Sequence, residues 1–145
     1  MTTKQENLRI AQAYVDSVNA HDLTAMGQYL ADDLEVEVAT GAHCPMTKPQ
    51  FLTYNGNYIN AFPDMRFDIT FTVSEGALIV LHWHASGTHT ETLTSPKGGI
   101  IVPTGRKATA RGCSTFEIQD DKITRAWIIW DMATLLAQLG LLPTI

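Results

Sequence analysis

The main change in the spacing of apolar residues along this chain falls near Met65, and it restricts the folds that the chain can adopt. Before Met65, apolar residues recur every three or four positions, as they do along one face of a helix. After Met65, apolar and polar residues alternate, as they do along strands that bury one face. Helices followed by a run of strands indicate an α+β fold, in which a helical layer covers one face of an antiparallel sheet.

The predicted helices span residues 5–20, 23–30, 48–61 and 132–139. The helix at 48–61 has the clearest start, because the Thr47 side chain is able to cap the amide of Gln50 while Gln50 reaches back to Thr47. Pro49 fits the first turn of this helix, where a missing amide proton costs no hydrogen bond. Gly140 marks the end of the last helix, since glycine readily adopts the left-handed conformation that terminates helices.

The predicted strands span residues 34–39, 66–73, 77–92, 107–118 and 122–130, and residues 119–121 join the last pair as a hairpin. The last strand carries Ile123, Trp127 and Ile129 on one predicted face and Ala126, Ile128 and Trp130 on the other. A strand that is apolar on both faces is covered on both faces. Because the helices cover only one face, we expect a second copy of the chain to cover the outer sheet face, which gives a homodimer.

Composition excludes several classes of protein. The chain has 145 residues, and we expect residues 1–145 to form a single domain. Its net charge is −5 and it has no run of basic residues, so we expect no binding to nucleic acid or to an anionic membrane. No stretch has the length of a membrane span or the pattern of a signal peptide, which predicts a cytoplasmic protein. Cys44 and Cys113 form no C-x-x-C motif, so we expect each to be a small buried apolar residue.

A series of short motifs runs along most of the chain. These are Phe62-Pro63-Asp64-Met65, Gly87-Thr88-His89-Thr90, Pro103-Thr104-Gly105-Arg106, Phe116-Glu117-Ile118, Asp121-Lys122-Ile123, Trp130-Asp131 and Gln138-Leu139-Gly140-Leu141. In this order and spacing they resemble the SnoaL-like polyketide cyclases, also called ester cyclases. The resemblance implies a ketosteroid-isomerase-like cone, in which a curved antiparallel sheet and N-terminal helices enclose an apolar pocket. It also implies a homodimer, a small apolar or aromatic carbonyl ligand, and neither a metal nor an organic cofactor.

The resemblance further implies a reaction and two site positions. In founding members of the family, an aspartate in the last strand and a histidine in the preceding strand serve the ring closure of an aromatic polyketide ester. Counting from the Asp121-Lys122-Ile123 turn puts Ile128 at the aspartate position and Ser114 at the histidine position. Both side chains are expected to face the pocket. Ile128 has no titratable group, and a serine without a partner is a poor base at neutral pH.

The candidates for moving a proton are therefore other residues, and each also has a structural interpretation. His89 is expected on the same inward strand face as Trp83, and imidazole titrates near neutral pH; it could instead hold the strand end by hydrogen bonds. Asp131 lies where the last strand meets the last helix, a position at which an aspartate caps the helix. Asp64 lies in a Phe-Pro-Asp-Met turn, where aspartate is common for conformational reasons.

Aromatic side chains and the family positions supply the expected ligand contacts. The tyrosines of the helices roof the cavity; most of them should be core, with one or more hydroxyls reaching the ligand. The residues expected to bind the substrate are Tyr14, Tyr54, Tyr58, Phe62, Trp83, Ser114, Phe116, Ile128 and Trp130.

His82 and His84 form a His-x-His pair whose imidazoles share one strand face and could both reach a metal ion. Their parity is opposite to that of Trp83, which puts them on the outer face of the sheet. No further ligand is evident from the spacing, so we predict interface hydrogen bonds and no metal site.

Three functions are compatible with these features. The first is an enzyme of secondary metabolism that cyclises, isomerises, hydrates or dehydrates an aromatic or polycyclic carbonyl compound by acid/base chemistry. The second is a family member without the catalytic aspartate, acting as a tailoring partner or as a non-catalytic binder of a small ligand. The third is a dimeric interaction scaffold, which would have a filled rather than an open cavity.

Overall fold

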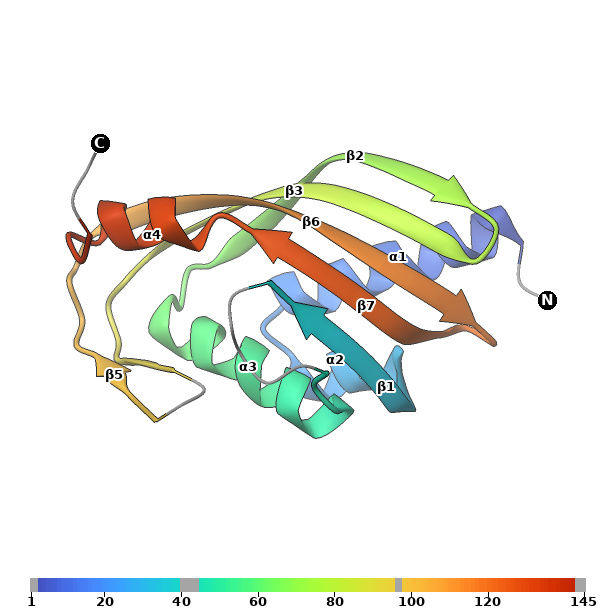
Figure 1. Ribbon diagram of the computed structural model, residues 1–145, viewed down its shortest axis with the longest axis horizontal. Coiled ribbons are helices and arrows are strands. Elements are labelled where there is room, and N and C mark those ends of the chain that lie inside the picture. The colour runs from blue at the N-terminus through green and yellow to red at the C-terminus, as the bar shows by residue number, and fades with distance from the viewer. Residues whose placement is uncertain (1–2, 40–44, 96–97, 143–145) are drawn as a thin grey trace.

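The computed structural model describes residues 3–39, 45–95 and 98–142 (Figure 1). Its helices are α1 (Lys4–Asn19), α2 (Leu23–Gln28), α3 (Lys48–Ala61) and α4 (Met132–Gln138). Its strands are β1 (Leu30–Val38), β2 (Arg66–Glu75), β3 (Leu78–Thr88), β4 (Leu93–Thr94), β5 (Ile100–Ile101), β6 (Lys107–Gln119) and β7 (Lys122–Trp130). The prediction for Cys44 lies outside the described residues.

Helix starts and stops follow the signals in the sequence. At α3 the predicted capping box is present, with Thr47 Oγ1 accepting from the Gln50 amide and Gln50 Oε1 accepting from the Thr47 amide at 2.9 Å. Gly140 has a φ of +80° just after α4, as expected of a residue that ends a helix. None of the helices in the described segments combines the length and the apolar character needed to cross a bilayer.

The main sheet has the strand order β1-β7-β6-β3-β2 and curves over α1 and α3, which lie on its concave side (Figure 1). Its pairs are antiparallel except for β1, which runs parallel to β7. The α+β cone with helices on one face is therefore confirmed, although the sheet is mostly rather than wholly antiparallel. The small β4–β5 ribbon, α4 and the end of α3 lie together at one end of the molecule (Figure 1).

Two strand predictions need correction. The strand expected over residues 77–92 ends at Thr88, because the His89 amide donates to the Arg106 carbonyl and the Thr90 amide donates to the Ala61 carbonyl. Residues 93–94 then form β4 with β5, a ribbon that was not predicted. At the other end of the fold, Leu30 begins β1 rather than ending the second helix.

The predicted faces of β7 are correct except at Ile123. Arg125 pairs with Glu117 and Ile123 pairs with Ile118, so Thr124 is an extra residue in this part of the ladder. Such a bulge reverses the side-chain alternation. Ile123 is therefore fully buried on the concave side, whereas Ile129 remains 64% exposed on the convex side.

Candidate functional site

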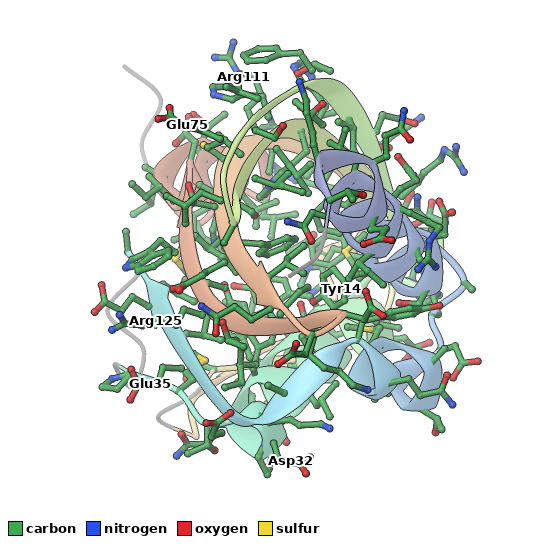
Figure 2. All side chains as sticks on the ribbon, turned by 90° about the vertical axis from the view of Figure 1, so that its right-hand side faces the viewer. Tyr14, Asp32, Glu35, Glu75, Arg111 and Arg125 are labelled. Carbon is green, nitrogen blue, oxygen red and sulfur yellow. The ribbon has the colours of Figure 1, made fainter. Side chains whose placement is uncertain are left out.

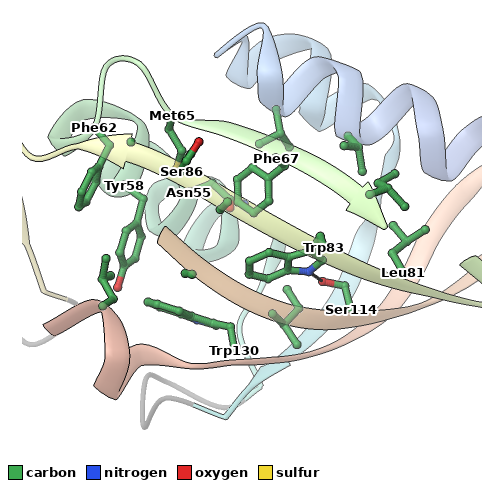
Figure 3. A pocket seen from close by; sticks show the side chains of 18 of the residues that line it. Asn55, Tyr58, Phe62, Met65, Phe67, Leu81, Trp83, Ser86, Ser114 and Trp130 are labelled. Carbon is green, nitrogen blue, oxygen red and sulfur yellow. Dashed lines mark hydrogen bonds between the residues drawn. The ribbon is translucent and has the colours of Figure 1, made fainter. Parts of the chain in front are cut away.

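A cavity of about 130 Å³ lies between α1, α3 and the concave face of the sheet (Figure 3). Most of its wall is apolar surface contributed by aromatic and aliphatic side chains. The wall continues onto the first residues of β6 and onto Leu135 of α4. A cavity of this kind, enclosed by helices and a curved sheet, suits a small apolar ligand.

The helices contribute every residue that was predicted from them. Tyr14 lies on α1, Tyr54 and Tyr58 lie on α3, and Phe62 follows α3 directly; all four line the cavity. Asn55 also lines it, and its side-chain amide donates to the Tyr14 hydroxyl at 3.4 Å. The roof of the cavity thus carries aromatic rings with hydroxyl groups attached.

The sheet contributes the remaining predicted residues. Trp83 of β3, Ser114 and Phe116 of β6, and Ile128 and Trp130 of β7 all line the cavity. Ser114 and Ile128 are direct cross-strand partners, so the two family positions lie side by side on the cavity wall. Neither of them carries a group that titrates near neutral pH.

Several lining residues were not predicted. Phe67 and Ile69 of β2, Met65 before it and Leu135 of α4 all contribute to the wall. The alternation of Phe67 and Ile69 was the available signal, since both share the inward face of β2. Leu135 had no signal, because its position depends on how α4 folds back against the sheet.

The tyrosine hydroxyls of the roof are held in a chain. Trp130 Nε1 donates to the Tyr54 hydroxyl at 3.0 Å, and the Tyr58 hydroxyl is hydrogen-bonded to Tyr54. Burial raises the pKa of Tyr14 and of Tyr58 well above the ordinary tyrosine value. Both hydroxyls are therefore protonated at physiological pH, and because the bond to Tyr54 raises the pKa of Tyr58, Tyr58 is the donor in that bond.

His89 does not lie where it was predicted. Its imidazole is fully buried, stacks on Phe62 with ring centroids 5.2 Å apart, and is not part of the cavity wall. Nδ1 lies 3.0 Å from Thr104 Oγ1 and accepts from the Thr104 amide at 3.3 Å. Burial lowers its pKa, and the Glu91 backbone opposes this effect in part. The prediction failed because the chain leaves the sheet after Thr88, so strand alternation does not extend to position 89.

The two aspartate candidates also lie outside the cavity wall, on the surface. Asp131 caps α4 by accepting from the Thr134 hydroxyl and from the Thr134 amide, and these bonds lower the pKa of its carboxyl group. Asp64 accepts from the Thr88 amide at 2.7 Å and from the Thr88 hydroxyl at 2.8 Å, which likewise lowers its pKa. Both carboxylates are thus occupied by local hydrogen bonds, as their structural interpretations predicted.

The cavity wall, as the described residues build it, is uncharged. Among the described residues, those that line it include no aspartate, glutamate, histidine, lysine or arginine. Its polar groups are hydroxyls, indole N–H groups, amides and backbone groups. The arrangement is able to bind and orient a carbonyl compound by hydrogen bonds, but it offers no carboxylate or imidazole as a proton acceptor.

The histidine pair lies on the convex face, as predicted. His82 stacks on Phe71 with ring centroids 4.2 Å apart and is the cross-strand partner of Cys113, which is half-buried rather than buried. His84 is exposed and lies opposite Arg111. No group of three or more metal-ligating side chains occurs in the described part of the chain.

A curved sheet closed by helices around an apolar cavity defines the ketosteroid-isomerase-like class of α+β proteins. Within this class, the chain belongs to the SnoaL-like polyketide cyclase family, whose model matches residues 8–139. The match covers most of the chain and confirms the resemblance found in the sequence motifs.

Several solved structures share this fold. AclR from Streptomyces galilaeus, a proposed hydroxylase, has a TM-score of 0.85 at 20% identity, over 99% of this chain and 86% of its own. IdmH from Streptomyces antibioticus, a proposed polyketide cyclase, has a TM-score of 0.78 at 25% identity, over 92% of this chain and 98% of its own. A proposed SnoaL-like cyclase from Jannaschia reaches 0.82 at 11% identity, over 99% of both chains. The search of curated proteins gives no significant match.

Proposed function

We propose that this protein binds an aromatic carbonyl compound of secondary metabolism in the cavity and promotes its ring closure without a carboxylate or imidazole base. The observation that carries the proposal is the cavity wall itself. It combines aromatic surface with protonated hydroxyl groups, and its described residues include no aspartate, glutamate or histidine. Membership of a polyketide cyclase family supports a carbonyl ligand and a ring-closing step.

When the substrate is a 1,3-dicarbonyl compound, ring closure does not need a strong base, because such compounds exist substantially as enols. The enol carbon forms a C–C bond with the carbon of a separate ketone elsewhere in the same molecule, and the electron pair of that ketone C=O bond moves to its oxygen. This oxygen takes up a proton, and the enol O–H releases one to water, so the reaction needs no co-reactant. Holding the two carbons in contact supplies most of the acceleration.

Tyr58 is the group best placed to assist this step. Its hydroxyl lines the cavity, stays protonated because of burial, and is linked through Tyr54 to Trp130. On ligand binding, the carbonyl oxygen would replace Tyr54 as the acceptor of the Tyr58 hydroxyl proton. This hydrogen bond would strengthen as negative charge develops on that oxygen. Catalysis by His89, Asp131 or Asp64 remains a prediction, and it would require each of them to act although none of them lines the cavity.

The test uses a model aromatic β-keto ester that also carries a separate ketone, onto which its enol carbon closes to form a six-membered ring. Tyr58→Phe should lower kcat/KM by about 10²-fold, since it removes the donor to the developing oxyanion. Tyr29→Phe is the matched control, because this tyrosine lies outside the cavity wall, and it should retain wild-type activity.

The wild-type pH–rate profile should show no bend between pH 4 and 7. A bend in that range that disappears in His89→Gln would instead identify His89 as the base and would refute the proposal.

A second candidate function is binding without catalysis, as a tailoring partner or ligand carrier. Ile128 at the family's aspartate position favours it, and AclR, described as a proposed hydroxylase, has a similar fold. It predicts tight binding of the model ester with no closure above the rate in buffer. The interaction-scaffold alternative predicts a filled cavity. It is not proposed, because the cavity of this protein is open.

We further propose that the convex sheet face forms a homodimer. Phe71 is 52% exposed, Val73 56% and Ile129 64%. These apolar side chains lie on one face of the sheet, on β2 and β7, with β3 and β6 between them. An apolar area of this kind is costly to leave in water. A second copy of the chain would cover it while leaving the cavity, on the opposite face, accessible.

A further inference from the structure

The indole of Trp83 forms part of the cavity wall. Its Nε1 donates to Ser114 Oγ at 3.0 Å, and both side chains are buried (Figure 3). Phe67 packs against the indole edge-on, with ring centroids 4.9 Å apart. The indole also lies directly over Gly112, where a Cβ atom would come within 2.3 Å of Trp83 Cζ2. The indole is thus fixed from three sides.

This contact uses Ser114 as an acceptor and, among the described residues, leaves its hydroxyl proton free to be donated. A serine hydroxyl donates one hydrogen bond and accepts up to two. Ser114 Oγ accepts from Trp83, and within the described part of the chain the hydroxyl donates to no other group. Accepting a hydrogen bond polarises the O–H group and makes it a better donor. The cross-strand neighbours of Ser114 are Leu81 and Ile128, which offer no acceptor from their side chains.

The size of the cavity limits what this donor is able to meet. A cavity of about 150 Å³ with an apolar lining holds one benzene ring. The cavity here is of similar size, about 130 Å³. It therefore encloses a single ring, and any ring fused to it has to extend beyond the wall. A carbonyl on the enclosed ring is able to reach Ser114, whereas a carbonyl on a central ring, flanked on both sides by other rings, is not.

The geometry points to a ligand class: an aromatic ketone whose terminal ring enters the cavity and whose carbonyl oxygen, on that ring, accepts a hydrogen bond from Ser114. This assignment rests on the proposed function, because it assumes that an aromatic carbonyl compound occupies the cavity. Beyond the proposed function, it specifies that the carbonyl oxygen lies on a terminal ring and that Ser114 is the residue that binds this oxygen.

The experiment compares 1-tetralone with tetralin, which has the same rings but no carbonyl, in the wild type and in Ser114→Ala. Binding is followed by calorimetry. The net value of one hydrogen bond predicts that Ser114→Ala weakens 1-tetralone roughly 2- to 12-fold. Tetralin should bind the wild type and Ser114→Ala equally. Any loss of tetralin binding in the variant measures general damage to the cavity and is subtracted from the loss of 1-tetralone binding. Ser86→Ala is the matched control, since it removes a hydroxyl from the same cavity wall and should leave the preference for the ketone unchanged.

Other outcomes separate the two proposals. If neither compound binds the wild type, the proposed function fails. If both bind and Ser114→Ala weakens both to the same extent, Ser114 does not recognise the carbonyl and the present inference alone fails. If 9-fluorenone, whose carbonyl is on the central ring, binds as tightly as 1-tetralone, the terminal-ring requirement is wrong. Should Ser114→Ala not fold, the infrared C=O band of 1-tetralone bound to the wild type decides: a shift to lower wavenumber than in an apolar solvent supports the hydrogen bond, and an unshifted band refutes it.

Discussion

At the scale of single residues, Asp64, Asp131 and His89 of the sequence motifs form hydrogen bonds within turns and helix caps and do not line the cavity. Asp64 and Asp131 each accept from the amide and the hydroxyl of one threonine, and His89 is bonded to Thr104. The titratable residues Asp64, Asp131 and His89 of the family motifs therefore stabilise turns and caps at the ends of strands and helices. Ser114 and Ile128, the positions to which the resemblance assigns the family's histidine and aspartate, do line the cavity.

The capping role of Asp131 is testable by two substitutions. Asp131→Ala should lower the free energy of unfolding by about 1 kcal/mol, because α4 loses its N-cap acceptor. Asp131→Asn keeps an acceptor oxygen and should lose only a small part of this stability. Ring closure of the model ester should be unaffected by Asp131→Asn. A stable Asp131→Asn protein that has lost activity would show that the carboxylate is catalytic and not only a cap.

His89 should make stability depend on pH. Burial lowers its folded-state pKa below the ordinary value of about 6.5, so the unfolded chain binds a proton more readily than the folded one. Its contribution is therefore complete above about pH 6.5, and it is lost as the pH falls toward the folded-state pKa. Urea unfolding between pH 7.5 and pH 5 measures this loss, which should be smaller in His89→Gln. Asp64 and Asp131, whose pKa values are lowered from 3.8, titrate below this window. Equal pH dependence in the two proteins would contradict the assignment.

At the scale of helices and strands, the sequence predicts what a local residue pattern marks and misses what no such pattern marks. The capping box of α3 and the hairpin between β6 and β7 are encoded within a few residues, and both were predicted. The parallel pairing of β1 with β7 depends on partners far along the chain, such as Leu30 and Ile123. The β4–β5 ribbon and the bulge at Thr124 have partners nearby, and they were missed because no residue pattern marks either of them.

The same distinction explains the site. The lining residues of β3, β6 and β7 were predicted because strand alternation fixes their faces. His89 was misplaced because it lies one residue beyond the strand, where alternation no longer applies. Leu135 was missed because nothing local indicates that α4 folds back onto the cavity.

The packing of β6 against Trp83 yields a prediction at this scale. Gly112→Ala would place a methyl group 2.3 Å from Trp83 Cζ2 and 2.8 Å from Trp130 Cβ, which neither neighbour is able to accommodate without moving. We expect a loss of about 1–3 kcal/mol in the free energy of unfolding. Gly27→Ala is the control, because its Cβ would meet only ordinary contacts at 3.6 Å and longer within α2, and alanine favours a helix. It should be neutral or stabilising in the same denaturation experiment. A Gly112→Ala protein of wild-type stability would show that Trp83 is not fixed over Gly112.

At the scale of the whole molecule, the two faces of the sheet have different tasks. The concave face builds the cavity with the helices, whereas the convex face presents two adjacent cross-strand rows. One row consists of Phe71, His82, Cys113 and Ile129, and the other of Val73, Val80, Thr115 and Trp127. At one margin of this face, Arg125 is paired with Glu35 at 3.4 Å and lies over Trp127 (Figure 2). An apolar centre with a charged margin is the composition expected of a protein interface.

The proposed dimer is therefore tested by placing one charge in the centre of the convex face. Ile129→Glu should shift the protein from dimer to monomer in sedimentation at micromolar concentration, because the interface would have to bury an unpaired carboxylate. Val102→Glu is the matched control, since Val102 is 66% exposed, close to the 64% of Ile129, but lies in the loop after β5 and away from this face. It should remain a dimer. Both proteins should bind 1-tetralone like the wild type, because neither residue lines the cavity. A wild-type monomer, or a dimer that survives Ile129→Glu and is lost in Val102→Glu, would place the contact elsewhere and leave the convex apolar rows without the partner proposed here.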